Sequence, residues 1–187
     1  MTPTFEQKLR GLKTAGRGSW SFAMRPDFQF DAGLGQRKLL DVDASDYGPS
    51  RRLDYELELG VWIAGENDLG ETVPITEAGS RIGGLCLLND WSARDLQAWE
   101  YQPLGPFLAK NFLTSVSPWV ITSEALAPFC IAQPARPEGD PAPLPYLLDA
   151  TDQTKGAFSI NLETWLATRA MRDAGLAPHR LGKGPAT

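Results

Sequence analysis

The sequence predicts an α+β domain in which strands predominate, and three stretches carry that prediction. Residues 53–63 alternate between apolar and polar side chains, the period of a strand with one buried face. Residues 82–88 form a short apolar run typical of a buried strand, and residues 158–166 alternate again. With 187 residues, 42% of them hydrophobic, the chain can bury the core of one globular domain.

The first half of the chain is expected to change from irregular backbone to strands. Residues 1–36 keep no sustained period of 2 or 3.6, so we expect an irregular leader there. A polar turn over 64–70 should return the chain through 73–75 as a hairpin or a wide loop. In the strand 53–63, one face would carry Leu53, Tyr55, Leu57 and Leu59, and the other Asp54, Glu56 and Glu58.

The second half is expected to contain one short helix, two further strands and long loops. Ser92 is a favourable N-cap for a helix after the strand 82–88, and Asp95 would complete a capping box. Residues 119–122 are a predicted strand. Prolines and glycine predict loops at 103–106 and 134–145. The strand 158–166 has no recognisable return strand, and residues 182–187 are expected to be a tail.

Charge and cysteine content argue against two classes of protein. Residues 1–38 hold 7 Lys and Arg against 3 Asp and Glu, which leaves 11 and 20 for the remainder, or +4 against −9. An acidic body argues against a nucleic-acid partner. Cys86 and Cys130 have no CxxC spacing and no histidine nearby, which argues against zinc, and Cys86 is expected to be a buried thiol.

The sequence also argues against a membrane protein. No apolar stretch approaches the roughly 20 residues that a membrane-spanning helix needs. Residues 1–25 are basic, a faint similarity to a transit peptide, but we interpret them as an unstructured leader. We therefore expect a cytoplasmic protein without a membrane anchor.

Three carboxylates are candidate ligands of a hard cation. Glu56 and Glu58 lie two apart on a predicted strand, so both point to the same side. A charged solvent face is the alternative, but the apolar neighbours favour a central strand, where acids would repel one another without a positive group between them. Asp90 ends the next strand and could join the same cation; alternatively it only favours the start of the helix.

Cationic and polar groups follow these acids. Arg94, Gln97 and Tyr101 fall on one face of the predicted helix, which could bind an oxygen-rich anion or be solvated. Lys110 and Thr114 follow the Pro/Gly loop among phenylalanines, where an ammonium needs a counter-charge. The single histidine, His179, gives no support for a Ser/His/Asp triad.

These residues lie in motifs that resemble the fumarylacetoacetate hydrolase family. The motifs are DYELELG at 54–60, NDWSARDLQAWEYQPLGPFLAK at 89–110 and SPWV at 117–120, and the similarity extends from about Gly35 to about Leu181. The resemblance implies hydrolysis of a carbon–carbon bond in the diketo acid 4-fumarylacetoacetate, giving fumarate and acetoacetate in tyrosine and phenylalanine breakdown. It also implies a bound Ca²⁺ or Mg²⁺, a homodimer and a mixed β-sandwich roll.

The resemblance also implies roles for individual residues. Arg94 and Lys110 would be catalytic, and Arg94, Gln97 and Tyr101 would contact the substrate. The family's histidine base and its fourth metal carboxylate have no counterpart in residues 1–34, and the family continues beyond the point where this chain ends. We therefore expect residues 35–181 to be an incomplete catalytic domain. The metal site would comprise Glu56, Glu58, Asp90, Lys110 and Thr114.

Two alternatives remain open at this point. A catalytically inactive, truncated member of the family would explain the missing histidine. A sister hydrolase or decarboxylase of the same superfamily would act on another diketo acid. The helix face of Arg94, Gln97 and Tyr101 favours hydrolysis of 4-fumarylacetoacetate over this alternative.

Overall fold

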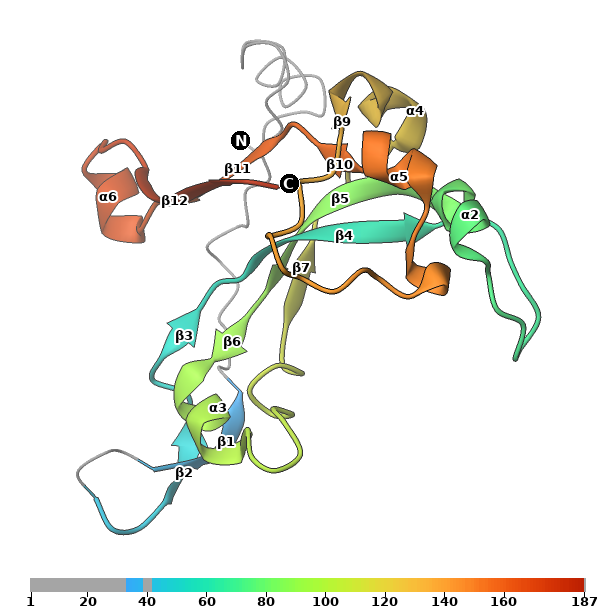
Figure 1. Cartoon of the computed structure of the whole chain (residues 1–187). Coiled ribbons are helices and arrows are strands. Elements are labelled where there is room, and N and C mark those ends of the chain that lie inside the picture. Colours follow the sequence, from blue (N-terminus) through green and yellow to red (C-terminus); the bar gives the residue numbers. More distant parts are fainter. Residues whose placement is uncertain (1–32, 39–41, 187) are drawn as a thin grey trace. The chain divides into compact units, whose positions relative to one another are not determined.

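The computed structural model describes residues 33–38 and 42–186, and Figure 1 shows their helices and strands in chain order. The expected leader 1–34 lies almost entirely outside these residues. Strand β1 (Leu34–Arg37) pairs antiparallel with β2 (Asp46–Pro49). The expectation of irregular backbone is therefore wrong for residues 34–36. Four residues are too few to show a period, and their partner strand begins only at Asp46.

A four-stranded antiparallel sheet follows, centred on β5 (Ile82–Asp90), which is the apolar run of the sequence. β4 (Leu57–Ile63) pairs with β5 along its length, as Figure 1 shows, and β7 (Thr114–Val116) and β8 (Ile121–Thr122) also pair with β5. A Cβ on Gly84 would clash with the backbone of Ile121, so a residue without a side chain lets β8 approach. The wide connection between β4 and β5 contains α2 (Ile75–Ala78) and the 3₁₀ turn η1 (Gly79–Arg81).

The strand predicted over 53–63 is interrupted. β3 (Leu53–Asp54) pairs with β6 (Ser92–Ala93), and β4 begins only at Leu57. At the interruption, the Asn89 side chain accepts the Glu56 N–H at 3.0 Å, and the Asp90 N–H donates to the Glu56 carbonyl at 3.1 Å. A side-chain amide thus replaces a ladder hydrogen bond, and sequence periodicity does not reveal such a replacement.

Helix α3 (Arg94–Glu100) forms where a helix is predicted, but it begins differently. Ser92 lies in β6, and the N-cap position is Ala93, whose side chain makes no capping hydrogen bond. The predicted capping box is therefore wrong. The Asp95 carboxylate instead accepts from the Ser50 hydroxyl at 2.5 Å and the Arg51 N–H at 2.8 Å. These bonds tie the start of α3 to the loop between β2 and β3.

The small buried core that supports α3 consists of Ala93, Leu96 and Ala109, with Phe112 packed against them. Leu96 also approaches β1, because a Cβ on Gly35 would lie 3.1 Å from a Leu96 methyl group. Close packing at these positions fixes the helix beside β1.

Replacing Asp95 by asparagine is expected to lower the free energy of unfolding by about 1–3 kcal/mol, because asparagine keeps one acceptor oxygen but loses the charge and one of the two oxygens that accept from Ser50 and Arg51. Burial acts to raise the pKa of Asp95, but the hydrogen bonds that it accepts outweigh burial and lower it. A lowered folded pKa stabilises the protein above the unfolded pKa, and this contribution is lost as pH falls through the folded pKa. Urea unfolding of both proteins at neutral and acidic pH measures the difference. A difference that stays constant with pH would contradict the ionic role.

The C-terminal third contains short paired strands. β9 (Cys130–Ile131) pairs with β10 (Ala157–Phe158), and β11 (Asn161–Leu166) pairs with β12 (His179–Pro185). β12 is the return strand that the sequence analysis did not find, so residues 182–185 are strand rather than tail. Its glycines conceal the strand, since glycine is depleted in strands. The remaining elements are α4 (Ser123–Leu126), η2 (Ala127–Phe129), η3 (Pro145–Leu147), α5 (Ala150–Lys155) and α6 (Arg169–Asp173).

The described residues thus form a β-rich mixed α and β structure with several small sheets, in agreement with the predicted class at that level. Cys86 is buried as expected, and both cysteines are free. In the part of the chain that the structure describes, no helix is long and apolar enough to cross a membrane.

Candidate metal and substrate site

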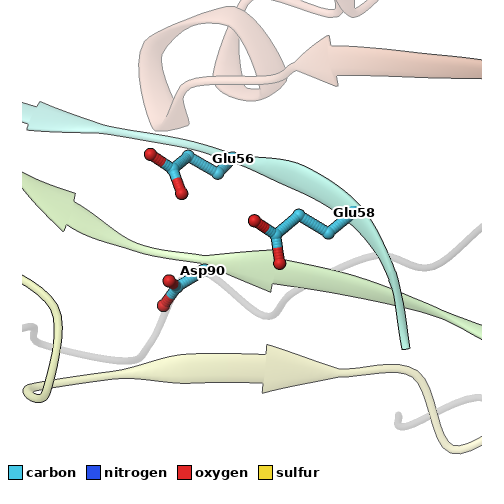
Figure 2. Close-up of side chains that lie close together, drawn as sticks. All are labelled: Glu56, Glu58 and Asp90. Atoms are coloured by element: carbon cyan, nitrogen blue, oxygen red, sulfur yellow. The ribbon is translucent and has the colours of Figure 1, made fainter. Parts of the chain in front are cut away.

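The three predicted carboxylates come together in the structure. Glu56 immediately precedes β4, Glu58 is the second residue of β4, and Asp90 is the last residue of the neighbouring strand β5. One carboxylate oxygen from each lies within 4.8 Å of the other two, and Figure 2 shows the three side chains on adjacent segments. We call these three residues the acidic cluster.

Lys110 supplies the positive charge that the sequence analysis expected between these acids. Its ammonium forms an ion pair with Glu56 and a longer one with Asp90, at 3.5 Å. The hydrogen bond from Lys110 lowers the pKa of the Glu56 carboxyl, and burial opposes this effect only in part. Glu56 is therefore ionised at neutral pH. The expected counter-charge of Lys110 is confirmed.

Arg94, the first residue of α3, also contacts the acidic cluster. Its guanidinium pairs with Glu56 at 3.0 Å and with Asp54 at 3.0 Å, and it donates to the Gln97 side-chain oxygen at 2.8 Å. The hydrogen bond with Asp54 raises the pKa of Arg94, so the guanidinium stays charged. Asp54, which the sequence analysis placed on one face with Glu56 and Glu58, thus pairs with the guanidinium.

The other predicted residues are less closely associated with the cluster. Thr114 begins β7 opposite Asp90, and its hydroxyl donates to the Asp90 carboxylate at 3.4 Å. Gln97 lies one turn beyond Arg94 on α3. Tyr101 is the C-cap of α3, and its side chain is half exposed. His179 is exposed in β12.

Sequence reasoning missed the contacts of two acids. Asp54 orients the Arg94 guanidinium, and Glu100 accepts hydrogen bonds from the backbone just before Lys110. Glu100 has no spacing signal. Asp54 was placed on the same predicted face as Glu56 and Glu58, but no sequence pattern indicated its ion pair with Arg94.

The arrangement is a cluster of hard oxygen donors next to a guanidinium, an ammonium and an amide, and side chains of these kinds suit a divalent cation and an oxygen-rich anion. A family model described as the C-terminal domain of fumarylacetoacetate (FAA) hydrolase matches residues 34–169. The chain therefore belongs to the fumarylacetoacetate hydrolase family.

Curated relatives agree with the family model. The chain is 53% identical over 115 residues to a protein of Caenorhabditis elegans named fumarylacetoacetase, covering 61% of this chain and 27% of that protein. It is 47% identical over 141 residues to the fumarylacetoacetases of Bos taurus and Homo sapiens, covering 75% of this chain and 32% of each. The chain thus spans about a third of the length of these relatives.

Proposed function

We propose that this protein hydrolyses the carbon–carbon bond of 4-fumarylacetoacetate to give fumarate and acetoacetate, a reaction of tyrosine and phenylalanine breakdown, with a divalent metal ion. The relatives named fumarylacetoacetase support the reaction class. The observation that carries the proposal for this chain is the position of Glu56, which is shared between the acidic cluster and the two cations, Arg94 and Lys110.

The donor set fits Ca²⁺ or Mg²⁺. Glu56, Glu58 and Asp90 offer carboxylate oxygens, which hard cations prefer, and their oxygens lie close enough to share one ion. Thr114 could add a hydroxyl next to Asp90. Lys110 as an ammonium has no free lone pair and would neighbour the ion rather than ligate it. The bound ion would act as a Lewis acid on the substrate carbonyl oxygens.

The neighbouring side chains could bind the carboxylate of a diketo acid and stabilise the enolate that its cleavage releases. Arg94 and Gln97 present a guanidinium and an amide on one helix face, which suits recognition of a carboxylate. Tyr101 extends that face and would contact the far end of the substrate. Bond cleavage places negative charge on the departing enolate oxygen, and Lys110 and Arg94 would stabilise it.

We also propose the domain, the oligomeric state and the cellular location in which this site works. Residues 35–181 would form part of a catalytic domain of the β-sandwich roll type that works as a homodimer in the cytoplasm. Small diketo acids would be its partners, with no role for nucleic acid or membrane.

The test is hydrolysis of fumarylacetoacetate by the purified chain, followed as loss of substrate absorbance. Turnover that requires Mg²⁺ or Ca²⁺ and stops with a chelator is the expected result, because the acidic cluster would hold the ion that acts as the Lewis acid. Folded protein without turnover would contradict the proposal and favour the inactive family member. Preference for a second diketo acid would favour the sister hydrolase.

A further inference from the structure

Glu100, the last residue of α3, makes two hydrogen bonds that its sequence position does not suggest. A single carboxylate oxygen, Oε1, accepts from the backbone N–H of Phe107 at 2.8 Å and of Ala109 at 2.7 Å. The two donors lie in the loop that leaves α3, so one side chain at the helix end holds the far end of the loop. Charged acceptors make shorter and stronger hydrogen bonds than neutral ones.

The loop that Glu100 holds leads directly to Lys110. Ala109 is completely buried, and its carbonyl accepts from the Ala93 N–H at 2.9 Å. The Lys110 N–H donates to the Phe107 carbonyl at 3.1 Å. The backbone on the N-terminal side of Lys110 is therefore fixed by β6 through Ala109 and by α3 through Glu100.

Without Glu100, two loop N–H groups would lose their acceptor. The residues between Glu100 and Phe107 include prolines and Gly105, whose φ of +96° is a conformation that favours glycine. None of them replaces the carboxylate as an acceptor for the N–H groups of Phe107 and Ala109. Loop backbone that loses its acceptors must find water, and this moves the residue that follows it.

We propose that Glu100 is a positioning residue for Lys110: by accepting from Phe107 and Ala109, it sets where the Lys110 ammonium meets Glu56 and Asp90. The inference rests on the proposed function for its catalytic consequence, but the position of Lys110 can be measured without turnover. This positioning role requires an acceptor oxygen from residue 100. It does not require the negative charge of Glu100 to contact the substrate.

The first test is the reactivity of lysine amines toward an acetylating reagent, measured by mass spectrometry on the full chain. Lys110 in the native protein is expected to react more slowly than the exposed Lys155, because its ammonium is ion-paired. Glu100→Ala should remove most of this protection, and Glu100→Gln, which keeps an acceptor oxygen, should retain it. The buried Cys86 thiol must stay unreactive in each variant, which shows that the core remains folded.

The second test is steady-state kinetics with fumarylacetoacetate. Glu100→Ala is expected to lower kcat about 10- to 100-fold with little change in KM, the cost of a catalytic group displaced by about 1 Å. Glu100→Gln should recover most of kcat, and Glu138→Ala, at an exposed carboxylate, should change neither parameter.

Two outcomes would overturn the inference. One is equal protection of Lys110 in Glu100→Ala and the native protein, and the other is a glutamine variant as impaired as the alanine variant. Absence of turnover in the native protein would contradict the proposed function alone, because the acetylation result still decides whether Glu100 positions Lys110.

Discussion

Replacing Lys110 by methionine is expected to lower kcat for fumarylacetoacetate about 100- to 1000-fold, the usual cost of removing a group that stabilises developing negative charge. Methionine keeps an unbranched side chain of similar volume but cannot donate to an enolate oxygen. The ammonium is available for this role because it is already held by Glu56 and Asp90 in a partly buried position. The steady-state rate of substrate loss at saturating substrate and metal gives kcat.

The matched control for this prediction is Lys155→Met, which removes an exposed ammonium at the end of α5 and should leave kcat unchanged. Lys110→Met should also bind the divalent cation at least as tightly as the native protein, since a competing positive charge is gone. An unchanged kcat would remove Lys110 from the chemistry. A large loss of metal affinity would instead make it part of the metal site itself.

The acidic cluster could be predicted from the sequence because simple periodicity determines it. Glu56 and Glu58 are two apart in extended backbone, and Asp90 ends the strand that pairs beside them. The residues alone required a positive group near these acids without identifying it, and only the family resemblance placed Lys110 beside them. Lys110 lies 54 residues from Glu56, and no local pattern encodes a contact at that separation.

Other features depend on contacts that leave no trace in residue type. The break between β3 and β4 depends on the Asn89 amide, and it accompanies the pairing of Asp54 with Arg94. The predicted capping box does not form because the Asp95 carboxylate accepts hydrogen bonds from the loop before β3. β12 was missed because its pairing with β11 overrides the weak strand preference of its glycines.

Substitution of the acidic cluster is expected to affect metal binding rather than folding. Glu56→Gln and Asp90→Asn should each weaken Mg²⁺ or Ca²⁺ binding by more than about tenfold, since even residues that only orient metal ligands cost about 10- to 100-fold when changed. Both substitutions preserve side-chain shape, so the loss reports the missing charge and ligand oxygen. Isothermal titration calorimetry with the chelator-treated protein measures the affinity.

Asp54→Asn provides the matched control, because it removes the same charge two residues from Glu56 at a carboxylate that pairs with Arg94 and lies outside the acidic cluster. Its effect on metal affinity should be clearly smaller than that of Glu56→Gln. Equal losses for the two variants would mean that the ion responds to the net charge of the region rather than to defined ligands. Unchanged affinity in both Glu56→Gln and Asp90→Asn would contradict the metal assignment. Neither Glu56 nor Asp90 would then contribute to binding, and Glu58 alone does not make a metal site.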